Sequence, residues 1–85
     1  MEIKVTETNI DGCGSNAELF VHSSKELSEA ALERLGELLH AVKRETNSDD
    51  WDTEEMVDEA ISRFSSETGI DLKIVSAPYA AELEF

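Results

Sequence analysis

The sequence predicts a two-layer α+β sandwich, in which a mainly antiparallel sheet of three or four strands carries two helices on one face, in the order ββααβ(β). Three observations lead to this prediction. Two N-terminal segments alternate apolar and polar residues as half-buried strands do, two longer segments follow with apolar residues at helical spacing, and the alternation returns after Gly69. A chain of 85 residues without internal repeats or a long linker is expected to form a single domain, residues 1–85.

Residues 1–8 and 17–22 are the two predicted N-terminal strands. The first places Ile3 and Val5 on one face, and the second repeats the alternation. Residues 9–16 between them contain glycine, aspartate and asparagine, the residue types that tolerate or stabilise turns. The pattern predicts a β-hairpin with a long tip.

The first helix is predicted to begin at Ser23 and to run to about Glu45. Ser23 and Glu26 have the spacing of a capping box, in which each side chain accepts a hydrogen bond from the main-chain N–H of the other residue. Gly36 costs about 1 kcal/mol relative to alanine inside a helix, and it indicates a close neighbour or a bend. The apolar residues form one broad stripe that faces the core: Leu27, Ala31, Leu32, Leu35, Leu38, Leu39 and Val42.

A second helix is predicted between Asp52, its N-cap, and Gly69, which ends it in the left-handed conformation. Glu55 stands where it completes a capping box with Asp52. The predicted buried stripe consists of Met56, Val57, Ala60, Ile61 and Phe64.

Two short strands are predicted after the second helix. Residues 70–74 alternate apolar and polar side chains and predict a third strand. In residues 79–85, which follow a proline, the apolar residues in phase are Tyr79, Ala81, Leu83 and Phe85. This segment predicts a fourth strand at an edge of the sheet, where a nearby proline is tolerated.

Charge is the strongest signal in the composition. The 20 Asp and Glu residues against 7 Lys and Arg give a formal net charge of −13 and a pI near 4.3. Nucleic-acid phosphates and anionic membrane surfaces repel such a chain, which argues against direct binding to either. The single cysteine excludes an intramolecular disulfide and a four-cysteine metal site. Because no signal-peptide pattern is present, the protein is expected in the cytoplasm.

Signals of catalysis are weak. His22 and His40 are the only histidines, and Cys13 lies between two glycines without a basic neighbour that would activate its thiol. A calcium loop that starts at Asp50 fails, because its sixth and twelfth residues are not the glycine and glutamate that an EF-hand requires. We expect no catalytic residues, no cofactor and no metal site.

The acidic residues are concentrated in two parts of the chain. Residues 45–59 contain no basic residue, and the outward face of the first helix carries further glutamates. Helix dipoles and solubility account for only part of this excess. We therefore predict a partner-binding surface formed by Glu45, Asp49, Asp50, Trp51, Asp52, Glu54, Glu55, Asp58 and Glu59, and extended by Glu29, Glu33 and Glu37.

Trp51 is the only tryptophan and lies among aspartates. One interpretation is that it covers the core between the two helices. The other is that it anchors a charged interface, because tryptophan is enriched among the residues that dominate binding energy.

These features predict a small acidic inhibitor that binds, without turnover, a basic nucleic-acid-binding or nuclease site of a partner protein. In size, charge and α+β layout the chain resembles the anti-CRISPR proteins, small inhibitors of phages and mobile elements. Its turn Asp11-Gly12-Cys13-Gly14 is similar to one found in that group. The resemblance implies a nuclease or a DNA-binding groove as the target.

Two alternatives stay open at the level of the sequence. The first is an immunity protein or antitoxin that neutralises a basic toxin nuclease, because it would use the same electrostatics. The second is a small enzyme or metal-dependent subunit that uses Cys13, His22 or His40. That alternative requires the three side chains to meet in one pocket.

Overall fold

The computed structural model describes residues 1–8, 16–46, 51–75 and 81–85. The predicted hairpin tip with Cys13, the acids Asp49 and Asp50, and Tyr79 lie outside the described residues. The described elements, in chain order, are β1 (Glu2–Glu7), β2 (Ala17–Ser23), α1 (Glu29–Glu45), α2 (Thr53–Thr68), β3 (Leu72–Val75) and β4 (Ala81–Glu84).

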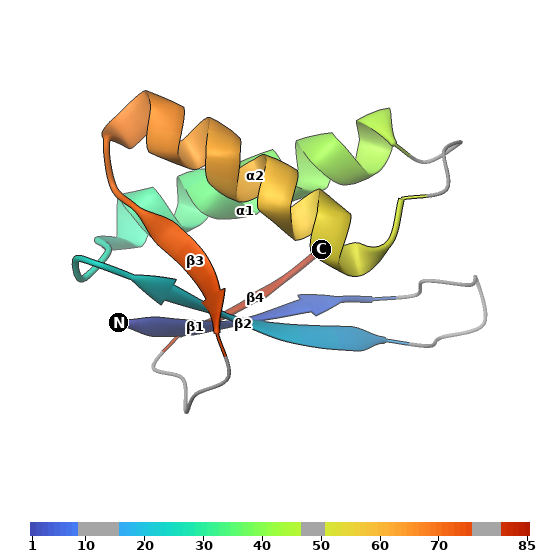
Figure 1. Ribbon diagram of the computed structural model, residues 1–85, viewed down its shortest axis with the longest axis horizontal. Helices are drawn as coiled ribbons and strands as arrows, with labels where there is room; N and C mark the ends of the chain where they lie inside the picture. Colours follow the sequence, from blue (N-terminus) through green and yellow to red (C-terminus); the bar gives the residue numbers. More distant parts are fainter. Residues whose placement is uncertain (9–15, 47–50, 76–80) are drawn as a thin grey trace.

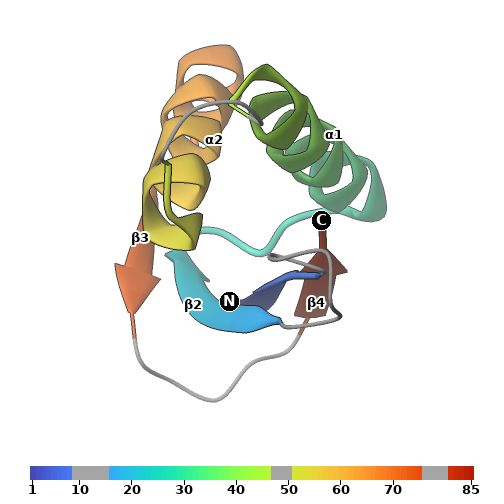
Figure 2. The same ribbon diagram turned by 90° about the vertical axis from the view of Figure 1, so that its right-hand side faces the viewer.

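The predicted α+β fold with the order ββααββ is confirmed. The four strands form one sheet in the order β3-β2-β1-β4, and both helices cover the same face of it (Figure 1). Strand β2 pairs antiparallel with β1 and with β3, whereas β4 pairs parallel with β1, so the sheet is mixed. Figure 2 shows α1 above the β4 side of the sheet and α2 above the β3 side.

The core lies between the helical layer and the inner face of the sheet. All five residues of the stripe predicted for the second helix are buried, and Ile3 and Val5 face them from β1. Of the stripe predicted for the first helix, Ala31 and Leu32 are only partly buried, and they pack against the edge of the core. Alternation in the strands and helical spacing in the helices therefore identified most of the core.

The capping box predicted at Ser23 is wrong. Ser23 is the last residue of β2, where it pairs with Leu72, and it is 1% exposed. Its main-chain N–H donates to the oxygen of Met1 at 2.7 Å, so the sheet holds this residue in an extended conformation. Helix α1 begins at Glu29 instead, and the Oγ of Ser28 accepts from the N–H of Ala31 at 3.2 Å.

The predicted ends of the second helix are confirmed. The Asp52 carboxylate accepts from the N–H of Glu55 at 2.9 Å, and the Glu55 carboxylate accepts from the N–H of Asp52 at 3.4 Å. Gly69 ends the helix with a φ of 74°. The neighbour that Gly36 indicated is Leu83 of β4, since a Cβ at Gly36 would lie 4.0 Å from a methyl carbon of that leucine.

A polar cluster joins the two layers where β1 and β4 end. The Glu7 side chain is 5% exposed, and its carboxylate lies 3.5 Å from the ammonium of Lys43 and accepts a hydrogen bond from the Thr53 hydroxyl. Lys43 also donates to the main-chain oxygens of Thr8 at 2.8 Å and Phe85 at 3.1 Å. Its ammonium lies 5.5 Å from the centre of the Phe85 ring, within range of a cation–π interaction. One ammonium thus connects α1 to the ends of β1 and β4.

Replacing Lys43 with methionine is expected to lower the free energy of unfolding by about 2 kcal/mol. Removing one partner of a fully buried ion pair costs roughly 3–5 kcal/mol, and Lys43 retains 29% exposure, which reduces the effect. The control is Lys25→Met, because Lys25 is exposed, and it should change stability by less than about 0.5 kcal/mol. Urea unfolding measures both variants, and equal midpoints for Lys43→Met and the wild type would contradict the role of this cluster.

Candidate protein-binding surface

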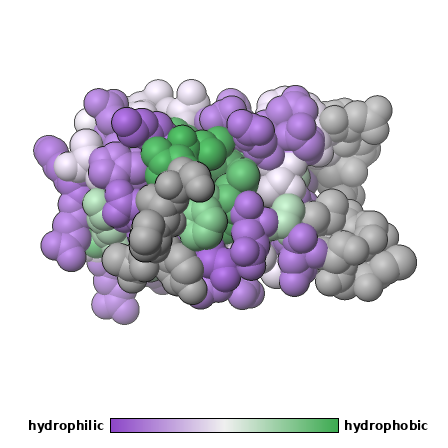
Figure 3. Space-filling view, turned by 60° about the horizontal axis from the view of Figure 1, so that its bottom comes forward, coloured by the Kyte–Doolittle hydropathy of each residue, from purple (hydrophilic) through white to green (hydrophobic). Residues whose placement is uncertain are grey.

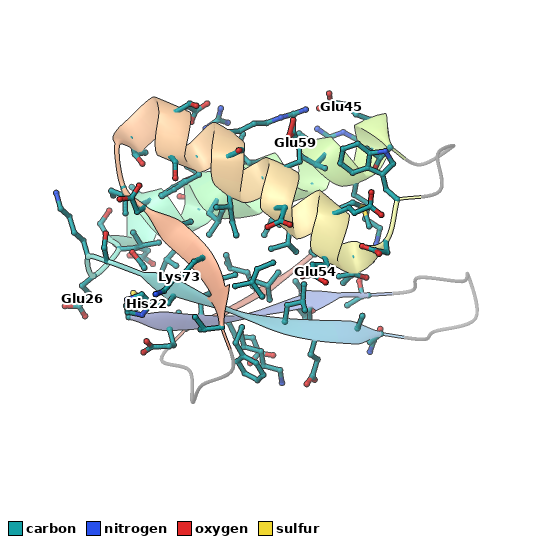
Figure 4. The ribbon with its side chains drawn as sticks, viewed as in Figure 1. His22, Glu26, Glu45, Glu54, Glu59 and Lys73 are labelled. Carbon is teal, nitrogen blue, oxygen red and sulfur yellow. The ribbon has the colours of Figure 1, made fainter. Side chains whose placement is uncertain are left out.

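The two helices run antiparallel, so the start of α2 lies beside the end of α1. Two ion pairs between the helices show this arrangement: Arg63 of α2 contacts Glu45 at the end of α1, and Arg34 of α1 contacts Glu67 near the end of α2. Figure 4 shows Glu45 and Glu54 toward one end of the molecule and His22 and Glu26 toward the other. Because Glu29 and Glu33 lie near the start of α1 and Glu45 lies at its end, the predicted acidic residues are distributed over both ends of the helical layer.

Arg63 contacts two of the predicted interface residues. Its guanidinium donates two hydrogen bonds to the Glu45 carboxylate, at 2.7 and 3.1 Å, and lies 3.5 Å from the carboxylate of Glu59. The hydrogen bonds from Arg63 hold the pKa of Glu45 below its ordinary value. Glu59 and Arg63 are four residues apart on one helix, so the sequence contains a local signal for their contact. Glu45 is 18 residues from Arg63, so only the tertiary structure reveals the contact between these two residues.

Arg34 also contacts two carboxylates, nearer the start of α1. Two hydrogen bonds join its guanidinium to the Glu67 carboxylate, and a third reaches Glu37 at 3.3 Å. The hydrogen bonds from Arg34 lower the pKa of Glu67. An open groove of about 630 Å³ follows the junction of the helices and is lined by both arginines and by Glu59 and Glu67. Glu37, Glu45 and Glu59 each contact one of the two arginines, which makes them less suited to attract a cationic partner than carboxylates that form no ion pair.

The start of α2 carries carboxylates that have no cationic partner among the described residues. We call this group the α2 acidic surface, and it consists of Trp51, Asp52, Glu54, Glu55 and Asp58. Its four acids are exposed. Asp52 and Glu55 hold the capping box, whereas Glu54 and Asp58 form no ion pair within the part of the chain that the structure describes.

Trp51 is exposed at the edge of the α2 acidic surface. It is 39% exposed, which makes it the one large hydrophobic side chain classed as exposed among the described residues. A tryptophan that covers the edge of a core also keeps its outer side in solvent, so this exposed fraction fits both interpretations of Trp51. Both interpretations stay predictions.

Glu29 and Glu33 lie elsewhere, near the start of α1. They border an open groove of about 520 Å³ between α1 and β4, together with Leu32 and Leu83. Because α1 and α2 are antiparallel, this groove and the α2 acidic surface lie at opposite ends of the helical layer. The single acidic surface that the sequence predicted is thus divided into two.

The two histidines lie on different layers. His22 is on the open face of the sheet, where its Nδ1 lies 2.6 Å from the Glu2 carboxylate and lowers the pKa of Glu2. That face, turned toward the viewer in Figure 3, is largely hydrophilic around an apolar area. His40 is exposed on α1, on the other side of the sheet. The structure therefore does not bring His22 and His40 into one pocket, and Cys13 lies outside the described residues.

The Arg63–Glu45 contact predicts a pH-dependent contribution to stability. A carboxyl group with a lowered pKa in the folded state stabilises the protein above its ordinary pKa, and it loses this contribution as the pH falls through the lowered value. The difference in melting temperature between wild type and Glu45→Gln should therefore be largest near neutral pH and shrink below about pH 4.5. The control is Glu33→Gln on the same helix, because Glu33 forms no ion pair among the described residues, and it should melt at or slightly above the wild type at neutral pH. A difference for Glu45→Gln that stays constant from about pH 7 to about pH 3 would contradict this assignment.

Comparisons with known proteins assign no family to this chain. No family model, curated protein or solved structure matches it. Among the described residues, no group of three His, Cys, Asp or Glu side chains is arranged to hold a metal ion. Neither of the helices described here combines the length and the hydropathy needed to cross a bilayer. Exposed charge and exposed aromatic surface are therefore the features from which function is inferred.

Proposed function

We propose that the protein is a small acidic inhibitor that binds the nucleic-acid-binding or nuclease site of a basic partner protein through the α2 acidic surface. It acts stoichiometrically and without catalysis. One observation carries the proposal: Glu54 and Asp58 have no cationic partner among the described residues and share one capped helix with the exposed Trp51 beside it. Arginines neutralise other acids of the helical layer, but not these.

The spacing of these charges suits a site that binds nucleic acid. Glu54 and Asp58 are four residues apart, which is about 6 Å along a helix axis. Duplex DNA carries one negative charge per roughly 1.7 Å of its axis, so Glu54 and Asp58 reproduce only part of its charge density, and Asp52 and Glu55 add two further carboxylates at the start of the same helix. A net charge of −13 steers a basic partner toward the protein, which gives fast and salt-sensitive association.

Trp51 adds apolar contact area, which charged side chains alone do not supply. Coulomb attraction between exposed groups is weak at physiological ionic strength, because screening limits its reach to about 8 Å. An aromatic side chain that becomes buried at an interface contributes apolar area at low entropic cost. We infer that the acids guide the partner and that Trp51 anchors it.

The resemblance to anti-CRISPR proteins in size, charge and layout supports a nucleic-acid-binding effector as the partner. A basic toxin nuclease fits the same surface, and it would make the protein an immunity protein or antitoxin. The identity of the captured partner distinguishes these two cases, because both require the same contact.

Reversing the charge at Glu54 and Asp58 is expected to weaken partner binding by at least tenfold, or about 1.4 kcal/mol. These positions leave the capping box of Asp52 and Glu55 intact, so stability should change little. The matched control is Glu26→Lys with Asp71→Lys, which changes the net charge equally. Both control residues are exposed, and Glu26 lies at the opposite end of the molecule (Figure 4).

The assay has two steps. Immobilised wild-type protein captures its partner from a lysate of the source cells, and the purified partner is then loaded with a fluorescent DNA duplex. Wild type and the control should displace the duplex at a stoichiometric dose, whereas the Glu54→Lys/Asp58→Lys variant should not. Equal displacement by all three proteins, or a captured protein that binds no nucleic acid, would overturn the proposal.

A further inference from the structure

The outer edge of β4 exposes main-chain hydrogen-bonding groups. Phe85 donates its N–H to the oxygen of Thr6 at 2.9 Å and accepts from the N–H of Thr8 at 2.8 Å, so the main chain of Phe85 points toward β1. Successive residues of a strand point their main-chain groups to opposite sides. The N–H and C=O groups of Glu82 and Glu84 therefore point away from β1, and no described residue pairs with them.

A groove with an apolar floor runs beside this edge. Leu32 of α1 and Leu83 of β4 are half-buried in it, and the exposed carboxylates of Glu29 and Glu33 form part of its border. Its volume is about 520 Å³. Figure 2 shows α1 above β4 at this side of the molecule. An additional strand placed along β4 would direct every second side chain into the groove.

The remaining side chains of such a strand would meet negative charge. Glu82 and Glu84 are exposed on the open face of the sheet, on the same strand as Leu83. Glu82 lies 3.8 Å from the ammonium of Lys4, while Glu84 forms no ion pair among the described residues. A strand that alternates basic and aliphatic residues would thus be complementary to both faces of the β4 edge.

The other edge of the sheet differs in charge. Strand β3 carries the exposed Lys73, and a lysine on an edge strand discourages pairing with another chain. The exposed side chains of β4 are instead the acidic residues Glu82 and Glu84. Pairing of β4 with β4 of a second copy is disfavoured, because it would bring Glu82 and Glu84 of the two copies together. Pairing of β4 with β3 of a second copy is left as an outcome of the test below.

We propose that the β4 edge binds an extended segment of a partner protein in which Lys or Arg alternates with aliphatic residues, and that this segment adds a fifth strand to the sheet. Main-chain hydrogen bonds to Glu82 and Glu84 supply affinity, and the groove beside Leu83 selects aliphatic side chains. This surface is separate from the α2 acidic surface, so the inference goes beyond the proposed function and does not rest on it.

A seven-residue peptide of alternating lysine and valine tests the proposal with the intact protein. Its binding should slow hydrogen exchange of the Glu82 and Glu84 amides, as measured by NMR. Glu84→Pro should weaken binding at least tenfold, because it removes an outward N–H while leaving the contacts of Phe85 with β1 in place. The matched control Glu84→Gln keeps the N–H and should lose less affinity than Glu84→Pro.

Each further result has a defined meaning. A peptide of alternating glutamate and valine should not bind, and the Glu54→Lys/Asp58→Lys variant should retain protection at Glu84. The proposal is overturned if the lysine–valine peptide protects amides at the start of α2 instead, or if Glu84→Pro binds as tightly as the wild type. Sedimentation that shows a dimer without peptide, abolished by Glu84→Pro, would also overturn it, because the occupant would then be a second copy.

Discussion

The ammonium group of Lys43 holds the two layers of this protein in register. It contacts the ends of β1 and β4 and the carboxylate of Glu7, which in turn accepts a hydrogen bond from Thr53 in the first turn of α2. The hydrophobic effect itself is not directional, so the position of the helices along the sheet depends on how core side chains interlock and on directional contacts. Charge-assisted hydrogen bonds are directional and fix that position. The orientation of the α2 acidic surface thus depends on a contact made within the fold.

The arginines have a similar internal role. Arg34 and Arg63 both bridge α1 and α2, and each uses the planar guanidinium to contact a carboxylate with two hydrogen bonds. Because these positive charges are committed to the junction of the helices, the start of α2 and the β4 side of α1 are left acidic. An excess of carboxylates over cations therefore produces separate acidic surfaces instead of a uniformly negative molecule.

Local patterns predicted the elements of this fold well, because each depends on residues close in the chain. The capping box at Asp52 and the left-handed turn at Gly69 are examples of such local signals. Ser23 shows where local patterns fail, because a serine is suited both to the start of a helix and to the end of a strand. Its pairing with Leu72, which is distant in the chain, places it in the strand. The alternation in residues 79–85 indicates a strand but says nothing of its direction, and the parallel pairing with β1 had no local signal.

The candidate site was harder to predict for the same reason. Helical spacing shows that Glu33 and Glu54 face outward, but it does not show which ends of the two helices meet. The antiparallel packing of α1 and α2 places these acids at opposite ends, and the contact of Arg63 with Glu45 crosses 18 residues. Neutralisation by a distant arginine is a tertiary property, and it decides which carboxylates remain available to a partner.

The parallel pairing of β1 with β4 also shapes how the chain folds. Thr8 bonds to Phe85 across 77 positions of sequence, so this contact closes almost the whole chain into a loop. Closing a loop of that length costs more entropy than forming the antiparallel hairpin of β1 and β2, and contacts between distant residues slow folding. We therefore expect the β1–β2 hairpin and the helices to assemble before β4 docks. Until β4 docks, the edge of β1 remains open to strand pairing with another chain.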